Sequence, residues 1–393
     1  MGKLQNVGTP RFYVDYIQWG LTTGLIKNND PYFVSGLGDG IWSDGFGIGG
    51  SGGGTYIHKL FNQKVAVLEE IPKMFCLDPT KAYEVPSPNP DGDINLRQLT
   101  VNLHTNTGST ASWKNTWDIN YAMLLNHNLH TASAKFGISS WILKLDEDED
   151  GNDIIINEKE GLGNFSVVNE IVSDVEKFNG WSLIDITTTP QDANSIQLSL
   201  TYDDHTNLDQ VPIRIGAISI GTHYDMPHSP DLNLSMDRDY GGFKRQITKG
   251  GSLLSSSNWI KPPMWSSGGA WELYASGGTE RATQTRAGRR SWNLSFSYLS
   301  DSDLMADMET LTIYPNQSNG NPDSYENVLV DNSFFGKFMH KTLGGSLRFV
   351  FQPDNTDFNI DGFAICTLDQ DSISIKQVAN NTYNISLKIV EVW

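Results

Sequence analysis

The sequence is poor in cysteine and has no long apolar run. Its 393 residues include two cysteines, Cys76 and Cys366, and no Cys-x-x-Cys pattern. We therefore expect neither a disulfide framework nor a thiolate metal site. No apolar run approaches the ~18 residues of a membrane-spanning helix, and the N-terminal stretch lacks the apolar core of a signal peptide. These absences predict a protein that folds in a cytoplasm and does not insert into a membrane.

Charge is also scarce, and most of it is negative. Charged residues make up 19% of the chain, and the formal net charge is −18. An acidic protein repels phosphate backbones, so we expect no nucleic-acid partner. The nearest approach to a basic patch consists of Arg281, Arg286, Arg289 and Arg290. A solvated loop or a turn that faces a protein partner explains these arginines without nucleic acid.

The composition favours a mainly β chain with many turns, because glycine is abundant and aromatics reach 11%. A chain of this length is expected to form two or three domains. Short apolar runs separated by turn residues between 94 and 235 predict a β-sandwich. Breaks near Pro90 and Met236 then divide the chain into an N-terminal strand and Gly-rich arm (1–90), the sandwich (91–235) and a closing unit (236–393).

The Gly-rich arm holds ten glycines between Gly36 and Gly54. Two alternatives remain for it. It is a flexible linker, or its backbone presses closely against a partner surface.

The closing unit is predicted to be α+β, with two short helices between its first and second strands. In the first strand Trp292, Leu294, Phe296 and Tyr298 form the apolar face. Ser300 is the expected N-cap of a helix that continues through Leu304, Met305, Met308 and Leu311. Asn332 or Ser333 is expected to cap a second helix, which contains Phe334 and Phe338 and ends at Gly344. Strands follow at about 346–352, 362–369, 371–378 and 382–392.

The last of these strands carries an apolar row that breaks near its end. Tyr383, Ile385, Leu387 and Ile389 share one face, but Glu391 then falls on that face and Val390 on the other. Either the strand end is covered on both faces, or a bulge near Val390 resets the pleat. We expect neighbouring copies to complete this sheet. The predicted interface residues here are Tyr383, Ile385, Leu387, Ile389 and Trp393.

Several segments resemble proteins of bacteriophage tails. They are Arg-Arg-x-Trp-x-Leu-x-Phe-x-Tyr-Leu at 289–299, Leu-Arg-Phe-Val-Phe-Gln-Pro-Asp from Leu347, and Leu-Lys-Ile-Val-Glu-Val-Trp from Leu387. With the aromatic-rich helix they resemble the closing domain of distal-tail and baseplate-type proteins. Tyr-Ala-Met-Leu-Leu-Asn-His-Asn-Leu from Tyr121 and Ile-Gly-Ala-Ile-Ser-Ile-Gly from Ile215 resemble the discoidin-like, galactose-binding-type sandwich of minor virion proteins.

The resemblance implies a jelly-roll or discoidin-like sandwich at 91–235 and a tail-type assembly domain at 236–393. It also implies a ring-forming structural subunit of the virion tail, assembled in the host cytoplasm, that joins the tail tube and hub to fibres or receptor-binding proteins. The alternative is a carbohydrate-binding adhesin or receptor-binding tail module, whose partner is a host-surface glycan.

The best metal candidates are Asp146, Asp148 and Asp150, because carboxylates at alternate positions followed by a glycine imitate the first half of a calcium loop. The second half fails, since the twelfth position is Asn157. A charged hairpin tip explains the same residues with fewer requirements, so no cofactor is expected and Ca²⁺ is the alternative.

Two histidine pairs are weaker metal candidates. His127 and His130 would need a helical or tightly turned segment to share an ion, and no cysteine or carboxylate accompanies them locally. The resemblance to the sandwich implies instead that Asn126, His127 and Asn128 form a polar cluster at a strand end that hydrogen-bonds the following loop, and this is the preferred interpretation. His223 and His228 flank Asp225 in a proline-rich turn.

The aromatic residues Trp259, Trp265, Trp271 and Tyr274 lie in a glycine-rich stretch. They are suited to stacking on sugar rings or to anchoring a protein interface, and the interface is the preferred interpretation. The sequence has no Gly-x-Ser-x-Gly elbow and no carboxylate pair that stands out, so we expect no catalytic residues and no enzyme.

Overall fold

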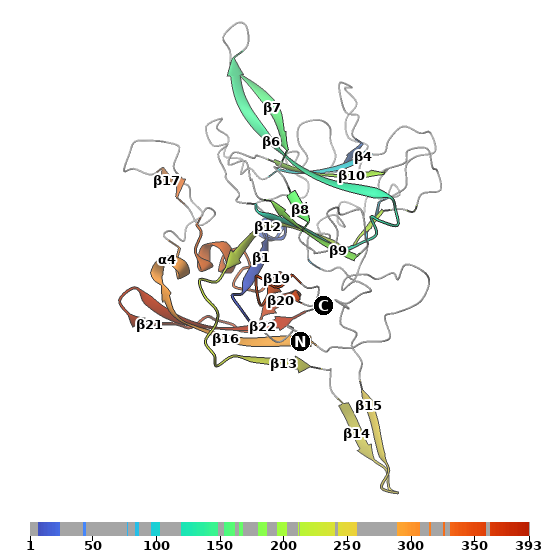
Figure 1. Cartoon of the computed structure of the whole chain (residues 1–393), viewed down its shortest axis with the longest axis vertical. Helices are drawn as coiled ribbons and strands as arrows, with labels where there is room; N and C mark the ends of the chain where they lie inside the picture. Colours follow the sequence, from blue (N-terminus) through green and yellow to red (C-terminus); the bar gives the residue numbers. More distant parts are fainter. Residues whose placement is uncertain are drawn as a thin grey trace.

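The computed structural model describes residues 7–23, 42–44, 77, 83–85, 96–102, 119–147, 153–161, 165–167, 180–186, 195–202, 211, 213–239, 243–257, 289–306, 314–315, 325–326, 331–358 and 362–392. The described part is mainly β, with short helices, which confirms the predicted class (Figure 1). None of its helices has the length and hydropathy needed to cross a bilayer.

The main element is an eleven-stranded antiparallel sheet. Its first strands, in spatial order, are β13 (Ser235–Asp239), β16 (Arg289–Ser300), β22 (Thr382–Glu391), β20 (Ala364–Leu368) and β19 (Phe349–Gln352). The order continues with β1 (Arg11–Asp15), β12 (Ala217–Asp225), β5 (Tyr121–His127), β9 (Gly180–Ile186) and β8 (Phe165–Val167), and β21 (Ile375–Ala379) also pairs with β22. All three predicted segments thus contribute strands, so the boundaries near 91 and 236 do not separate the sheets.

Smaller antiparallel sheets accompany the large one. The five-stranded sheet has the order β2 (Trp42–Asp44), β4 (Leu96–Asn102), β10 (Ser195–Tyr202), β6 (Ala134–Glu147) and β7 (Asp153–Gly161). The two-stranded sheets are β3 (Tyr83–Val85) with β11 (Ile213–Ile215), β14 (Phe243–Ile247) with β15 (Leu253–Ser257), and β17 (Tyr314–Pro315) with β18 (Tyr325–Glu326).

Strand β1 joins the two halves of the large sheet, because it pairs with β12 on one side and β19 on the other. Its side chains are buried on both faces, with Phe12 and Val14 in one apolar cluster and Tyr13 in the other. Gly221 of β12 permits this close pairing, since a Cβ there would lie 2.0 Å from the carbonyl oxygen of Val14. The N-terminal strand is therefore a core element of the fold.

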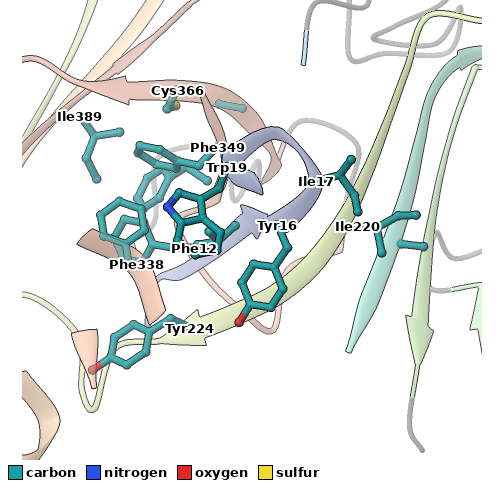
Figure 2. Packing of buried hydrophobic residues seen from close by; sticks show 14 of the residues in the cluster. Phe12, Tyr16, Ile17, Trp19, Ile220, Tyr224, Phe338, Phe349, Cys366 and Ile389 are labelled. Carbon is teal, nitrogen blue, oxygen red and sulfur yellow. The ribbon is translucent and has the colours of Figure 1, made fainter. Parts of the chain in front are cut away.

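Aromatic side chains fill the larger cluster around Phe12. Its ring centroid lies 4.5 Å from that of Phe338 and 5.8 Å from that of Phe349, and Figure 2 shows the three rings together with Trp19 nearby. Phe338 belongs to η4 (Phe334–Met339), a π-helical turn that packs on this face of the sheet. Helix α1 (Tyr16–Thr23), which follows β1 directly, contributes Tyr16, Ile17 and Trp19 to the same cluster.

Both predicted helix caps in the closing unit are confirmed. The Ser300 hydroxyl accepts a hydrogen bond from the Asp303 amide and begins α4 (Asp301–Leu304), and the Ser333 hydroxyl accepts one from the Gly336 amide and begins η4. The second helix ends at Met339, earlier than the predicted Gly344, which lies with a φ of 73° in the turns that follow η4. The predicted continuation through Met305 is wrong, because α4 ends at Leu304 and Met305 is extended with a ψ of 141°. Met308 and Leu311 lie outside the described residues.

The prediction for β16 is wrong at one position. Trp292, Leu294 and Phe296 are buried as expected, but the pairing with β22 shifts between Phe296 and Leu299. This bulge turns Leu299 into the core and leaves Tyr298 78% exposed.

Strand β22 has no bulge near Val390, because its pairing with β16 and β20 runs in register through Ile389 and Val390. Glu391 is accordingly buried on the core face. The expectation that another copy completes this strand is wrong for β22, since β16 occupies one edge and β20 and β21 share the other.

Candidate assembly interface

The most exposed apolar side chains of the described residues occur in two places, and the first is the β14–β15 hairpin. Ile247 pairs with Leu253 and Gln246 with Leu254. Lys249, Gly250 and Gly251 form the loop, which the Thr248 amide closes by donating to the Ser252 carbonyl at 2.9 Å. Gly251 has a φ of 79°, as the last residue of a three-residue hairpin loop requires. We call Phe243–Ser257 the hairpin arm.

The hairpin arm extends away from the large sheet (Figure 1). Within the described residues β14 pairs with β15 alone. Ile247 is 72% exposed, Leu253 59% and Leu254 56%. Because neighbouring residues of a strand point to opposite faces, Leu253 and Leu254 place apolar side chains on both faces of the arm. An isolated two-stranded hairpin is marginally stable in water, so these side chains are suited to burial by a partner.

The hairpin arm is also basic, unlike the chain as a whole. Lys244, Arg245 and Lys249 lie in it, and it contains no aspartate or glutamate, whereas the chain carries a net charge of −18. Opposite charge favours encounter and orients partners. An acidic surface is therefore the expected counterpart.

The second exposed apolar group lies at the bulge of β16. Tyr298 has a φ of 64°, which is strained for a bulky side chain, and its amide donates to the Asn384 side-chain oxygen at 3.0 Å. Leu232 is fully exposed. Its neighbour Asp231 lies against β16, since the Asp231 amide donates to the Ser295 carbonyl at 2.8 Å. The Asp231 carboxylate also accepts from the Ser297 hydroxyl at 2.7 Å.

Two carboxylates lie close to these apolar residues in the sequence, since Asp231 precedes Leu232 directly. Asp301, the exposed first residue of α4, lies three residues after Tyr298 in the chain and forms a hydrogen bond with Tyr383 that raises the pKa of that phenol. We call Asp231, Leu232, Tyr298 and Asp301 the bulge patch. It combines an aromatic anchor, an aliphatic side chain and negative charge.

The interior holds an ion pair that fixes the start of β16 against the end of β22. Glu391 accepts from the Arg290 backbone amide at 2.9 Å, from Nε at 3.2 Å and from Nη2 at 3.1 Å. Nη2 of Arg290 also donates to the Phe363 carbonyl at 2.5 Å, and the guanidinium lies 5.3 Å from the centroid of the Trp292 ring. Both charged side chains are buried. Arg290 is thus a core residue, while Arg281 and Arg286 lie outside the described residues.

Cys366 lies opposite Glu391 in the β20–β22 pair. Burial raises the pKa of its thiol well above the usual value, and the Glu391 carboxylate adds to this effect. The thiol is therefore kept protonated and apolar in character.

A second buried carboxyl lies at the junction of β1 and α1. Asp15 Oδ1 accepts from the Ile17 amide at 2.9 Å and the Gln18 amide at 3.0 Å, so it caps α1. Burial raises its pKa to about 8, despite the amide hydrogen bonds that favour the carboxylate. Asp15 is therefore mostly protonated at neutral pH.

The histidine pairs do not form metal sites in the structure. His127 is buried, its Nε2 lies 2.8 Å from the Ser182 hydroxyl, and burial lowers its pKa to about 3. His130 is exposed. The Asn128 side-chain oxygen accepts from the Arg214 amide of β11 at 2.6 Å, so this side chain bonds a distant strand and not the following loop that was expected.

His223 and His228 also have other surroundings. The His223 ring lies 5.8 Å from that of Tyr13, and His228 Nδ1 lies 2.7 Å from the Ser229 carbonyl. Asp225, between them, holds Arg11 in two hydrogen bonds of 2.6 and 2.8 Å.

The calcium prediction falls partly outside the described residues. Asp146 is a strand residue of β6 opposite Ile154, so the predicted hairpin between these segments is confirmed. Asp148 and Asp150 are not described. The described residues contain no group of three or more potential metal ligands.

The interface predictions have mixed outcomes. Ile385, Leu387 and Ile389 are buried in the chain's own core, so a partner cannot contact them while the sheet is intact, and Tyr383 is half-buried beside them. Trp259, Trp265, Trp271, Tyr274 and Trp393 lie outside the described residues. The sequence did contain a signal for the hairpin arm that was missed, namely two Gly residues between alternating segments.

Comparison with known proteins gives no relationship for this chain. No protein-family model matches the sequence. No curated protein and no solved structure matches it either.

Proposed function

We propose that this chain is a structural virion protein of a bacteriophage tail tip or baseplate. In this role it is a ring-forming subunit that joins the tail tube and hub to fibres or receptor-binding proteins, and it performs no catalysis. The resemblance of the closing segments supports the phage assignment. The single observation that supports an assembly role is the hairpin arm, whose Ile247, Leu253 and Leu254 side chains are exposed.

The hairpin arm and the large sheet differ in stability. The arm is a two-stranded hairpin whose apolar residues gain free energy when a partner covers them. The large sheet is buried on both faces at β1 and β5 and carries the buried Arg290–Glu391 pair. A rigid platform with a projecting apolar arm is the arrangement expected of a subunit that binds other subunits.

A second copy of the chain is the partner that best fits the arm. The arm carries only positive charge, and the rest of the chain supplies the excess of aspartate and glutamate. Copies of the same chain therefore attract one another through the arm. Most stable homo-oligomers close into symmetric assemblies, and a contact between two different surfaces closes into a ring when the rotation permits.

The finer fold assignments are part of this proposal. Strands β4, β10, β6 and β7 of the five-stranded sheet lie in residues 91–235, and we assign them to a discoidin-like sandwich whose other strands, β5, β8, β9 and β12, belong to the large sheet. The placement of α4 and η4 between β16 and β19 is consistent with a tail-type α+β assembly domain in residues 236–393.

Sedimentation velocity and negative-stain images of the purified full-length chain test the proposal. We expect discrete rings that grow in population with protein concentration. The variant in which Ile247, Leu253 and Leu254 are changed to serine should keep its circular dichroism spectrum and lose the rings. A monomer or trimer that is retained on a glycan column would instead support the carbohydrate-binding alternative and contradict the ring.

A further inference from the structure

The position of the hairpin arm relative to the bulge patch indicates how one copy meets the next. Strand β13 runs antiparallel to β16, and its last residue, Asp239, pairs with Arg289 at the start of β16. The arm follows β13, whereas Tyr298 lies near the other end of β16. At about 3.3 Å per residue, the nine residues from Arg289 to Tyr298 separate the two features by roughly 30 Å.

The arm also points away from its own bulge patch. Figure 1 places α4, which follows the bulge, and the arm at opposite sides of the large sheet. A contact between an arm and a bulge patch therefore joins two copies. It uses two different surfaces, so each copy can offer its arm to one neighbour and its patch to the other.

We propose that the hairpin arm of one copy docks on the bulge patch of the next copy. This inference rests on the proposed function and adds the identity of the receiving surface. Ile247, Leu253 and Leu254 supply the apolar side of the contact, and Leu232 and Tyr298 receive it. Lys244, Arg245 and Lys249 match the carboxylates Asp231 and Asp301 in sign.

The strained backbone at Tyr298 supports this assignment. A bulky residue at positive φ costs stability, and here it lifts a phenol ring out of the sheet and into solvent. Tyrosine is among the residues that contribute most to binding at protein interfaces, because a large rigid ring is buried with little loss of entropy. The Asn384 side chain holds this conformation through the Tyr298 amide.

Cross-linking between two variants, each with one added cysteine beside the native Cys76 and Cys366, tests the contact. Leu254→Cys is placed in one preparation and Leu232→Cys in another, and the two are mixed, assembled and oxidised. Because each preparation carries one new thiol, a mixed disulfide reports an arm-to-patch contact between copies. Val211→Cys replaces Leu232→Cys in the control, since Val211 is an exposed apolar residue outside the patch. We expect the mixed dimer with Leu232→Cys and only background with Val211→Cys.

A second variant separates docking from folding. Glycine adopts positive φ without strain, so Tyr298→Gly removes the ring while relieving the backbone. Leu343→Gly is the matched control, because Leu343 also has a positive φ, 51°, and is exposed elsewhere. Tyr298→Gly should weaken assembly by about tenfold or more, and Leu343→Gly should not.

The outcomes distinguish this inference from the function on which it rests. Rings that form without the mixed disulfide, and that respond equally to both glycine variants, would overturn the docking assignment and leave the ring-forming function standing. A chain that stays monomeric at every concentration would overturn both.

Discussion

The buried Arg290–Glu391 pair allows a quantitative test of what holds the sheet together. In Glu391→Gln the guanidinium stays charged and buried, but it loses the carboxylate that accepts from three N–H groups. Removing one partner of a buried pair typically costs about 3–5 kcal/mol, because the remaining charge is left without compensation. We expect a loss of unfolding free energy in that range.

The double variant Arg290→Met with Glu391→Leu should recover most of this loss. Apolar residues of similar volume avoid the desolvation cost of both charges, so such replacements are often neutral. The Phe363 carbonyl does lose its donor, at a cost of about 1 kcal/mol. A double-mutant cycle with Arg290→Met and Glu391→Leu as its single variants should therefore give a coupling energy above ~2 kcal/mol.

Urea unfolding followed by the fluorescence of the eleven tryptophans measures these differences. The matched control is Lys388→Met, which breaks the exposed pair between Lys388 and Asp369. Exposed pairs contribute about 0–1 kcal/mol. If Glu391→Gln lowers the unfolding free energy no more than Lys388→Met does, the buried pair does not hold the sheet together.

Three further predictions concern the junction of β1, β5 and β12. Asp15 has a pKa of about 8 in the folded chain and near 3.8 in the unfolded chain. The stability that its protonated form gives the folded state is therefore complete below pH 3.8 and is lost as the pH rises toward 8. From pH 5 to 7 the native chain should lose about 2 kcal/mol more than Asp15→Asn, and equal slopes in urea unfolding would contradict this. His127 has a pKa of about 3 in the folded chain and 6.5 in the unfolded chain. The stability that its neutral form gives the folded state is therefore complete above pH 6.5 and is lost as the pH falls toward 3. Between pH 6 and 4 the native chain should lose about 2 kcal/mol more than His127→Gln, and a variant that is equally acid-sensitive would rule this out. Gly221→Ala should lower the unfolding free energy by about 2 kcal/mol, because its Cβ would meet the Val14 carbonyl. Gly250→Ala, in the open hairpin loop, should leave thermal unfolding almost unchanged. Similar effects of the two variants would show that the β1–β12 contact is not tight.

The closing unit was the most predictable part of the fold, because its signals are local. Ser300 and Ser333 are helix caps with a clear sequence signature, whereas the second helix ends at Met339 and not at Gly344 as predicted. The strands of this unit follow from alternation of apolar residues. The place of β1 was not predictable, since pairing with β12 and β19 depends on contacts with residues more than 200 positions away.

The errors in the candidate interface have physical causes. The apolar row of β22 resembled an exposed edge, but apolar alternation shows only that one face is buried and not by what. The bulge after Phe296 reversed the direction of Tyr298, and no turn residue marks it in the sequence. In the sequence, Glu391 falls on the same face of its strand as Leu387 and Ile389, and Arg290 falls on the same face as Trp292. These positions indicate a buried pair.

A three-dimensional reconstruction of the assembled protein by electron cryomicroscopy tests the central claim most directly. We expect a closed ring in which the β14–β15 hairpin of each subunit lies against Leu232 and Tyr298 of its neighbour. An assembly whose hairpins all project into solvent would contradict the role of the arm, and particles that contain a single copy would contradict the ring.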